Sequence, residues 1–473
     1  MNQRNVPPFV SIVIPNYNGA HYLPMCLEAI RDLQYPSDRF EVIVSDNGSV
    51  DGSIELLRDK YPWVRVIENG QNLGFASGCN VGIRASRGDY IVLLNNDAAP
   101  EPIWLENLVA VAEANPQAGI VTGRIRLFYD QLVLRILANP VYQLSDGRVV
   151  SVRVFGVETG IPGGVVQYLE GFYGWERASA EGMFRWMGGK ALLGIPVPPG
   201  DGDWTLILRL AVLAGQGTPV RLVISLHEQY LAEWMLSEEF PATYELRIPA
   251  LARAWAVPLL QNAGSIVFWD GSGRDRGTFV RDCELFYEED RGQYSVVEEV
   301  AAGCGASLLL RRTMLEDVGL LDDDFFLYYE DTDLSLRARW RGWKVLYAPE
   351  AIVRHIHCGS SQEWSPLFIY YTDRNRLAML FKNGLPSQVL RAWISYGTGA
   401  VVHLLRVVVA WLKGKENWHE NARYALIRWR VIKSLLCWLP KLWRERRRIH
   451  RGARVASAEM IRWFGGENAC RYL

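Results

Sequence analysis

The sequence contains few cysteines, and no two of them form a CxxC pair. This pattern excludes a zinc ribbon and argues against a disulfide framework, so we expect a reducing compartment. A secretory pattern is also missing at the amino terminus, because the first apolar run ends at Pro15 after only about six residues. We therefore expect a cytoplasmic protein. The seven cysteines stand at positions 26, 79, 283, 304, 358, 437 and 470.

Long uncharged apolar runs are absent as well, even in the carboxyl-terminal region. Val389–Leu412 is apolar, but its longest stretch without Lys, Arg, Asp or Glu is Ala392–Leu405. This stretch is shorter than the roughly 20 residues of a membrane-spanning helix. We expect amphipathic helices that lie on an anionic membrane, at the inner face of the cell membrane. A basic helix pair that packs on the rest of the protein is the alternative.

The charge is distributed unevenly, although the formal net charge is only −1. Residues 366–473 contain 20 Lys and Arg against 6 Asp and Glu, together with 7 of the 18 Trp, whereas the rest of the chain is acidic. A basic, Trp-rich segment favours a membrane surface as its partner. No recognised nucleic-acid-binding module accompanies it, so we expect no nucleic-acid partner.

The first 125 residues alternate between short apolar runs and helical patterns, with Gly, Asn or Asp at the joins. This alternation predicts an α/β domain with a mostly parallel sheet, whose ligands bind at the carboxyl ends of the strands. The apolar runs are 10–14, 42–45, 64–67, 90–94 and 120–121, and the helical patterns lie near 22–33, 51–60, 76–86 and 101–114.

The pattern changes near residue 128. The segment that follows is rich in Gly and Pro and contains strand-like stretches without helices, which predicts an inserted β-sandwich-like domain. The α/β pattern returns at 259, and the end of the chain is helical. We therefore predict a discontinuous α/β domain of residues 1–128 plus 259–365, an inserted β-rich domain of residues 130–258, and a helical tail of residues 366–473.

Polar residues follow two of the expected strands. Asp46 follows the second strand, where a carboxylate can accept hydrogen bonds from a nucleoside, although helix capping explains it equally well. Asn95, Asn96 and Asp97 follow the fourth strand and offer the oxygen ligands that Mg²⁺ or Mn²⁺ prefers. Taken alone, a solvated turn is the more frequent explanation of such a sequence.

Three acids, Glu330, Asp331 and Asp333, stand at the start of an expected helix, after an aromatic run. The helix dipole favours acids there, so capping is one explanation. A general base is the other, because aromatic surroundings raise the pKa of a carboxylate. His355 lies on an expected strand, on the same face as His357. Together with Asp97 it would complete a metal site, although a structural histidine is more common.

In their order along the chain, eight segments resemble the family 2 glycosyltransferases, and most closely the rhamnosyltransferase-like branch with its GT-A fold. The resemblance covers roughly residues 10–128 and 259–380, and its strength lies in the ordered set, because each segment alone is common. The segments are SIVIPNYNG, DNGSVDGS, NLGFASGCNVGI, LLNNDA, GASLLLRR, LDDDFFLYYEDTDLSLR, GWKVLYAPEAIVRH and YYTDRNR.

The resemblance implies a role for each matching residue. One set would bind the nucleotide and the donor sugar: Pro15, Tyr17, Asp46, Asn72, Gly74, Phe75, Asn80, Asn95 and Asn96. Asp97 matches the last acid of the family's DXD metal motif, whose first position is Asn95 here, and His355 matches a histidine that helps to hold the metal. Asp331, preceded by Glu330, matches the catalytic base of the ED motif.

The function that this resemblance implies is that of an inverting glycosyltransferase that depends on Mg²⁺ or Mn²⁺. It would move a sugar, with rhamnose as a candidate, from a nucleotide diphosphate to a hydroxyl of a glycan or lipid-linked acceptor in cell-surface polysaccharide synthesis. The metal would stabilise the leaving diphosphate, and Asp331 would take the proton from the acceptor.

Two other classes of function stay open. A glycan-binding protein could have kept a transferase scaffold without its catalysis. A glycoside hydrolase also uses paired acids, but it needs no base-binding strand ends. A dehydrogenase is disfavoured, because no GxGxxG follows the first strand.

The inserted domain contains aromatic residues that could stack on sugars, which predicts a lectin-like domain that holds a glycan acceptor. Packing of the same residues in a core explains them equally well. They are Tyr173, Trp175, Trp186, Trp204 and Trp234.

Overall fold

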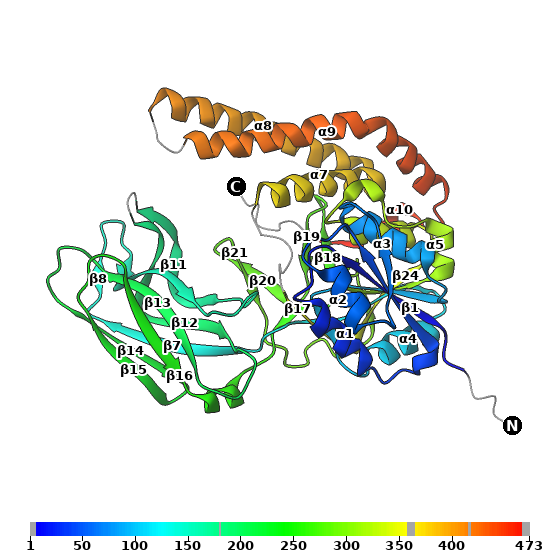
Figure 1. Cartoon of the computed structure of the whole chain (residues 1–473). Helices are drawn as coiled ribbons and strands as arrows, with labels where there is room; N and C mark the ends of the chain where they lie inside the picture. Colours follow the sequence, from blue (N-terminus) through cyan, green and yellow to red (C-terminus); the bar gives the residue numbers. More distant parts are fainter. Residues whose placement is uncertain (1–5, 179–180, 357–364, 415–417, 466–473) are drawn as a thin grey trace. The chain divides into compact units, whose positions relative to one another are not determined.

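The computed structural model describes residues 6–178, 181–356, 365–414 and 418–465 (Figure 1). Its contacts divide the chain into two units. The first unit contains Met1–Arg126, Gln261–Thr278 and Gly292–Leu473. The second unit contains Leu127–Leu260 and Phe279–Arg291.

The first unit is built around a mixed sheet. Four strands pair in parallel in the order β3-β2-β1-β4, and β23 then lies antiparallel between β4 and β6. The sheet continues from β6 through β24 to β22. In addition, β17 pairs with β6, and β5 pairs with β24. The bounds are β1 Val10–Asn16, β2 Phe40–Asp46, β3 Arg65–Glu68, β4 Tyr90–Leu94, β5 Ala98–Pro100, β6 Ala118–Leu127, β17 Leu260–Asn262, β22 Glu298–Glu299, β23 Ser307–Arg311 and β24 Lys344–His355.

Helices cover both faces of this sheet, so its central strands are apolar on both sides. Ile12 packs in one core with α1, α2 and α4, whereas Val13, the next residue of β1, packs in another with α3, α5 and α6. The predicted α/β fold is therefore confirmed, with antiparallel strands added to its parallel half. The bounds are α1 Leu23–Arg31, α2 Ser53–Lys60, α3 Gly74–Ala85, α4 Trp104–Ala114, α5 Arg312–Val318 and α6 Glu330–Trp340.

The carboxyl-terminal helices belong to the first unit, whereas the sequence analysis had set residues 366–473 apart as a tail. Trp340 of α6 shares a core with Leu377 of α7 and Val431 of α9, which gives the physical reason for the difference. By length and composition α8 could cross a membrane, and 22% of its most apolar window is buried. The bounds are α7 Pro366–Asn383, α8 Pro386–Leu412, α9 Trp418–Arg451 and α10 Ser457–Ile461.

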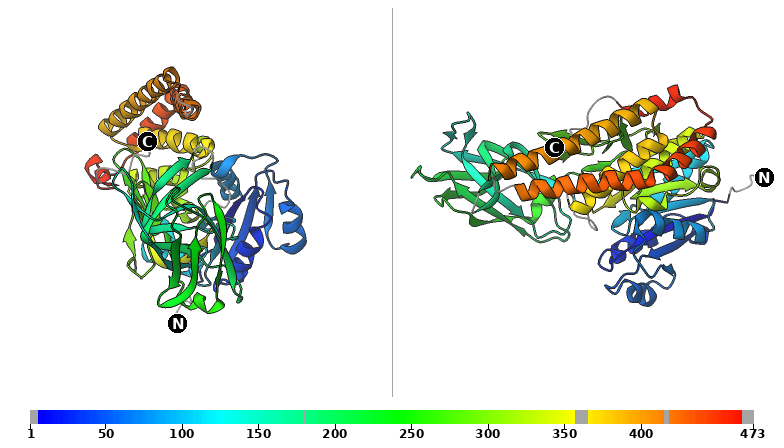
Figure 2. Two further views of the ribbon diagram at one scale, coloured as in Figure 1. Left: turned by 90° about the vertical axis from the view of Figure 1, so that its left-hand side faces the viewer. Right: turned by 90° about the horizontal axis from the view of Figure 1, so that it is seen from above.

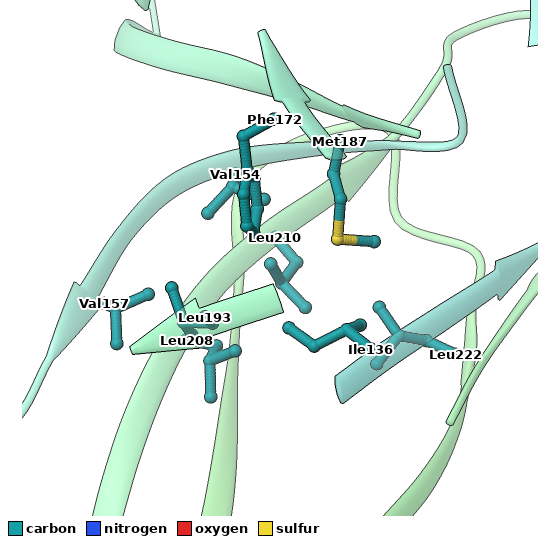
Figure 3. A pocket seen from close by; sticks show the side chains of 9 residues that line it. All are labelled: Ile136, Val154, Val157, Phe172, Met187, Leu193, Leu208, Leu210 and Leu222. Carbon is teal, nitrogen blue, oxygen red and sulfur yellow. The ribbon is translucent and has the colours of Figure 1, made fainter. Parts of the chain in front are cut away.

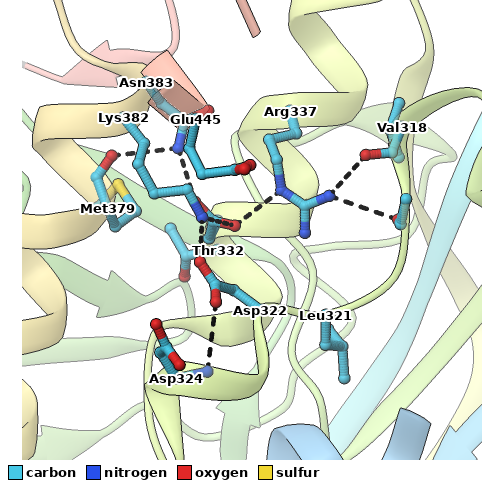
Figure 4. Close-up of polar contacts among 12 residues, drawn as sticks. Val318, Leu321, Asp322, Asp324, Thr332, Arg337, Met379, Lys382, Asn383 and Glu445 are labelled. Atoms are coloured by element: carbon cyan, nitrogen blue, oxygen red, sulfur yellow. Dashed lines mark hydrogen bonds and ion pairs between the residues drawn. The ribbon is translucent and has the colours of Figure 1, made fainter. Parts of the chain in front are cut away.

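A buried polar network ties these helices to α6 (Figure 4). Asp333 of α6 accepts hydrogen bonds from Arg337 at 2.7 Å, from Lys382 of α7 at 2.8 Å and from Asn383 at 2.8 Å. Lys382 also reaches Asp322 at 2.7 Å. Burial raises the pKa of Asp322, but the charge and hydrogen bond of Lys382, the charge of Lys441 and the hydrogen bond from the Asp324 amide together outweigh it and lower that pKa to about 2. The network therefore holds paired charges with almost no access to water.

The second unit consists mainly of antiparallel strands. Seven strands follow the order β15-β14-β7-β12-β10-β13-β16, and β11 pairs with β12. Trp234 of β15 and Tyr244 of β16, the two outermost strands, have ring centroids only 5.2 Å apart, so the sheet curls around its core. The bounds are β7 Gln131–Asn139, β10 Val152–Glu158, β11 Gln167–Ala178, β12 Gly182–Pro196, β13 Trp204–Val212, β14 Val220–Leu226, β15 Gln229–Leu236 and β16 Ala242–Ile248.

The interior of this curled sheet is apolar (Figure 3). Aliphatic side chains alternate inward along the strands, as β7 and β14 show. A cavity of about 10 Å³ lies among them. Its lining is wholly apolar, and the cavity is too small for a sugar. The lining residues are Ile136, Val154, Val157, Phe172, Met187, Leu193, Leu208, Leu210 and Leu222.

The boundaries of the second unit differ from the predicted insert of residues 130–258. Residues 279–291, which we had predicted within the α/β domain, belong to it. They contain most of the hairpin of β20 Thr278–Arg281 and β21 Glu284–Tyr287. Glu284 forms an ion pair with the buried Arg185 of β12, whose guanidinium lies over the rings of Tyr168 and Trp175. This pairing joins residues about a hundred positions apart, which local sequence patterns do not reveal.

Candidate active site

The carboxyl ends of β1 and β2 are linked through the carboxylate of Asp46. One oxygen of Asp46 accepts from the amides of Gly48 and Ser49, and the other accepts from Asn16 at 2.8 Å and the Ser49 hydroxyl at 2.6 Å. A carboxylate offers about four acceptor positions, so these contacts use them fully. In this structure Asp46 therefore orders the loop after β2, and its predicted contact with a base stays a prediction.

Pro15 and Tyr17 flank this loop at the end of β1. Pro15 is partly buried, and the side chain of Tyr17 is exposed. Asn16 between them is buried and accepts a hydrogen bond from Asn96 at 2.7 Å, which connects β1 to the end of β4. The structure thus brings the predicted base pocket and the Asn-Asn-Asp segment to one edge of the sheet.

The four remaining residues predicted for the donor lie in the loop before α3 (Asn72) and in α3 itself (Gly74, Phe75 and Asn80). The side chain of Asn72 accepts a hydrogen bond from the Gly74 amide at 2.9 Å, at the start of the helix. Gly74 has a φ of +80°, and a Cβ there would lie 2.5 Å from Phe326, so only glycine fits. The amide of Phe75 donates to the carbonyl of Phe326 at 2.6 Å. This loop therefore packs directly against the segment that leads to the ED acids.

Asn80 makes its hydrogen bonds within the protein. Its side chain is buried, donates to the carbonyl of Leu321 and to Asp323, and accepts from the Leu321 amide. These contacts anchor the loop before the ED acids. A structural role accounts for Asn80, and its donor contact stays a prediction.

Asp97, Asn95 and His355 come together at the ends of β4 and β24. Nε2 of His355 lies 3.1 Å from Oδ1 of Asp97 and 3.1 Å from Nδ2 of Asn95. Oδ1 of Asp97 and Oδ1 of Asn95 are both buried without a hydrogen-bond partner. Two ligand atoms about 2.1 Å from one ion and at right angles are about 3 Å apart, so the spacing fits a shared metal ion.

A hydrogen bond at Nδ1 of His355 fixes the orientation of the imidazole ring. Nδ1 lies 3.0 Å from Oε1 of Gln261 and donates a hydrogen bond to it, because an amide oxygen can only accept. Nε2 therefore carries no proton and has a free lone pair for a ligand. Sequence analysis missed Gln261, which lies 94 residues before His355. His357, predicted on the same strand face, lies outside the described residues. Among the described residues, no group of three or more His, Cys, Asp or Glu side chains could hold a metal ion.

Asp331 and Glu330 lie in the first turn of α6. Oδ2 of Asp331 accepts from the Gly305 amide at 2.8 Å, and Oδ1 accepts from the Thr332 amide at 2.6 Å. Burial raises the pKa of Asp331 above its ordinary value, although these hydrogen bonds oppose the shift. A Cβ on Gly305 would lie 3.2 Å from the ring of Phe75 and 3.5 Å from Asp331. Phe75, at the start of α3, and Asp331 therefore both lie next to Gly305.

Glu330 is the more deeply enclosed of the two acids. Burial and the adjacent Asp331 raise its pKa well above the ordinary value, and its Oε2 is buried without a hydrogen-bond partner. Burial thus disfavours the charged form of Glu330. Asp331, whose carboxylate accepts hydrogen bonds from the amides of Gly305 and Thr332, is the better candidate for the base.

The segment Phe325–Tyr329 before these acids has an unusual backbone that sequence analysis did not predict. Phe326, Tyr328 and Tyr329 all have positive φ angles, between 58° and 70°. Such conformations persist only where surrounding contacts impose them. Here Nδ2 of the buried Asn375 on α7 donates to the carbonyls of Phe325, Leu327 and Tyr328 at 2.7 to 2.8 Å.

A further acid at the site, Asp275, was also missed. It ends β19 (Gly273–Asp275), which pairs with β18 (Ser265–Phe268). Its Oδ1 accepts from Asn262, the residue after Gln261, at 2.6 Å. Burial raises the pKa of Asp275 to about 6, and the charge of Asp331 contributes, whereas His355 lowers it. Asp275 therefore interacts electrostatically with both Asp331 and His355.

Of the five aromatic residues of the second unit that could stack on sugars, four pack against core side chains. Trp186 is buried in a small core, and Tyr173, Trp204 and Trp234 are partly buried and pack against core side chains. Of the five, only Trp175 is exposed, and Arg185 covers one face of its ring. Core packing explains four of the five, and glycan binding by this unit stays a prediction.

The fold and this edge define the class of the protein. Its mixed sheet, with amide and acidic side chains at the carboxyl ends of β1, β2 and β4, is that of a GT-A-like, Rossmann-type nucleotide-sugar domain. The family described as "Glycosyl transferase family 2" matches residues 11–148, and "Glycosyltransferase like family 2" matches residues 261–378. The chain therefore contains glycosyltransferase family 2 domains.

Curated relatives support the same family over short segments. "Glycosyltransferase AglE" of Haloferax volcanii is 34% identical over 125 residues, which are 26% of this chain and 41% of that protein. The "Undecaprenyl-phosphate 4-deoxy-4-formamido-L-arabinose transferase" of Pseudomonas savastanoi pv. phaseolicola is 36% identical over 124 residues, 25% of this chain and 36% of that protein. The chain thus spans less than half the length of these relatives.

Similar solved structures carry related descriptions. The mannosyltransferase PcManGT from Pyrobaculum calidifontis, described in complex with GDP-Man and Mn²⁺, is 12% identical with a TM-score of 0.39, covering 90% of this chain and 86% of that one. GalNAc-T7, described with UDP, GalNAc and Mn²⁺, is 13% identical with a TM-score of 0.41, covering 81% and 52%.

Proposed function

We propose that this protein is an inverting, metal-dependent glycosyltransferase that moves a sugar from a nucleotide diphosphate donor to an acceptor hydroxyl. The observation that carries the proposal is the pair of buried oxygens of Asn95 and Asp97 without hydrogen-bond partners beside His355, in a unit that also holds the buried carboxylate of Asp331, whose pKa is raised. A glycan-binding protein has no need for this combination of metal ligands and base.

Asp97, His355 and Asn95 would hold the metal, with the ring of His355 fixed by Gln261. Oxygen and imidazole ligands suit Mn²⁺ or Mg²⁺. When bound, such an ion stabilises the charge that develops on a departing diphosphate. No other chemistry is required of it.

Asp331 would act on the acceptor. Its raised pKa makes it a stronger base than an exposed aspartate, and Gly305 and Thr332 fix both of its oxygens. It would take the proton of the acceptor hydroxyl while that oxygen attacks the anomeric carbon on the face opposite the leaving group. This single displacement inverts the anomeric configuration.

The donor and acceptor follow from likeness. The sequence resembles the rhamnosyltransferase-like branch, so dTDP-rhamnose is the first donor to try. One relative is named for a transfer that involves undecaprenyl phosphate, which supports a lipid-linked acceptor at the cytoplasmic face of a membrane. The exposed basic and apolar side chains of the carboxyl-terminal helices support the same location.

The experiment is a turnover assay with sugars carried on UDP, dTDP and GDP, in which release of the nucleoside diphosphate is measured with Mn²⁺ present. We expect Asp331→Asn to bind the donor as the wild type does but to lose about 10²- to 10⁴-fold in rate, the usual contribution of a general base. Asp38→Asn, at an exposed acid of the same unit, serves as the control. Near-normal turnover by Asp331→Asn would remove this residue from the mechanism.

A further inference from the structure

Both helices of the α8–α9 hairpin expose apolar side chains to solvent, and we call this set of side chains the ridge. On α8, exposed apolar side chains recur at spacings of three and four residues, which places them along one helix face. Leu405 and Leu412 are 59% and 69% exposed. The full α8 set is Leu390, Ile394, Val401, Val402, Leu404, Leu405, Val408, Val409, Trp411 and Leu412, and the α9 set is Tyr424, Leu426, Trp429, Leu436, Leu439 and Trp443.

The opposite face of α8 packs within the protein. Ala392, Tyr396 and Ala400 are buried, and Tyr396 donates to Asp373 of α7 at 3.0 Å. Figure 2 shows α8 and α9 running side by side over much of their length. The ridge is therefore the outer surface of a folded hairpin. So large an exposed apolar surface marks an interaction site.

The charges of the hairpin identify its partner. The helix α8 contains two arginines and no acid, and α9 contains ten Lys or Arg and two Glu. Exposed bases such as Arg406, Arg423, Arg430 and Lys433 stand among the apolar side chains. A second copy of this chain would bring two strongly basic hairpins together, which costs free energy, whereas an anionic bilayer neutralises the charges and accepts the apolar side chains.

The packing also indicates how the hairpin meets the bilayer. Although α8 is long enough to cross a membrane, it is packed along α9 and exposes Arg391 and Arg406. Crossing would carry these charges, and those of α9, into hydrocarbon. Lying in the interface leaves the bases at the headgroups and the ridge in the acyl region.

The hairpin and the catalytic segment are mechanically connected. Lys441 of α9 pairs with Asp324, and Arg374 of α7 donates to the carbonyl of Asp324 at 2.8 Å and stacks on Trp438 of α9. These contacts reach the residues immediately before the ED acids. A membrane-bound hairpin would therefore hold the base at a fixed height above the lipid surface.

We propose that the α8–α9 ridge docks the enzyme in one leaflet of an anionic bilayer, with its helices parallel to the membrane plane, where a lipid-linked acceptor is presented. The inference rests on the proposed function for its purpose, but its test does not, because membrane binding is measured without any sugar donor. Loss of membrane binding and loss of sugar transfer are therefore separate results.

The test is co-sedimentation of the whole chain with vesicles of phosphatidylcholine, alone or mixed with phosphatidylglycerol. We expect binding to the mixed vesicles, at least about tenfold stronger than to phosphatidylcholine alone and weakened by high salt. The double variant Leu405→Glu with Val409→Glu should lose it. The matched control is Phe240→Glu with Val296→Glu, which changes two equally exposed apolar residues outside the hairpin.

Four outcomes would overturn the proposal. The first is a wild type that ignores anionic vesicles at low salt, and the second is a ridge variant that binds them as well as the control. A wild-type dimer that the ridge variant dissolves, without vesicle binding, would assign the face to a second copy. Protein that alkaline carbonate fails to extract from the vesicles would show a spanning helix. Unchanged circular dichroism in the ridge variant verifies that it folds.

Discussion

The two units of this protein bury different kinds of side chain. In the first unit, carboxylates, amides and a histidine are buried at the carboxyl edge of the sheet, and some of their polar atoms have no partner. In the second unit, the interior is aliphatic, and a typical ion pair, Arg221 with Glu233, lies at the surface. Both units bury some polar atoms without a hydrogen-bond partner, which costs free energy. In the second unit these atoms belong to Tyr, Arg and Trp side chains, whereas in the first they include carboxylate and amide oxygens, which are the ligands that a divalent metal ion prefers. The comparison therefore favours the first unit as the place of the chemistry.

The largest effect should come from the buried network. Lys382→Met would leave Asp333 and Asp322 buried with less compensating charge, at a cost of about 3–5 kcal/mol. Arg221→Met, which breaks the exposed pair in the second unit, should cost no more than about 1 kcal/mol. Urea unfolding monitored by circular dichroism compares the two. Equal costs would mean that burial does not distinguish these pairs.

A cavity variant in the second unit should destabilise it without touching the chemistry. Leu208→Ala removes a fully buried side chain next to the apolar cavity and should cost about 2–5 kcal/mol. Because no ligand atom is expected there, the affinity for a nucleoside diphosphate should stay as in the wild type at a temperature where the variant is folded. Calorimetric titration measures that affinity. A changed affinity would contradict the division of roles.

The next prediction concerns the strained segment before the ED acids. Asn375→Ala removes the hydrogen bonds that hold three carbonyls of this segment, so Asp331 should lose its position. We expect kcat to fall about 10- to 100-fold while the donor KM changes little, since misplacement of a catalytic group is costly. Thr398→Ala, at an exposed position on α8, is the control. A change confined to the donor KM would assign Asn375 to donor binding instead.

The smallest effect should be a pH-dependent one at Asp275. Its folded pKa of about 6 lies above the ordinary value near 4, so the folded state binds the proton more tightly than the unfolded state. The stability that this protonation contributes is full below pH 4 and lost as the pH rises to about 6. Asp275→Asn should therefore gain on the order of 1 kcal/mol relative to the wild type between pH 4 and pH 8. Thermal melts at both pH values measure this difference, and an identical offset at the two values would contradict it.

Local sequence patterns were sufficient to predict much of the fold of the first unit. The continuous apolar run Tyr90–Leu94 predicts a strand buried on both faces, and β4 has these bounds. The polar residues after it, Asn95 to Asp97, lie at the predicted edge with His355. These predictions rest on neighbours in sequence, where periodicity and turn chemistry operate.

Other features depend on partners far apart in sequence. Gln261 orients His355 across 94 residues, and Asn375 holds carbonyls about 50 residues before it. The different charge and Trp content of residues 366–473 predict a separate tail, but Lys382 pairs with Asp322 and Arg374 donates to the carbonyl of Asp324.

The central claim, that the carboxyl edge of the first unit binds a nucleoside diphosphate with a metal, has one direct test. Thermal unfolding is followed with UDP, dTDP and GDP, with and without Mn²⁺, for the wild type and Asp97→Ala. A ligand at about 100 times its Kd adds roughly 2.7 kcal/mol of stability. We predict that one nucleotide stabilises the wild type only with Mn²⁺ and that Asp97→Ala loses this gain. The account would be contradicted by a wild type that no nucleotide stabilises, or by an Asp97→Ala variant that keeps the full metal-dependent shift.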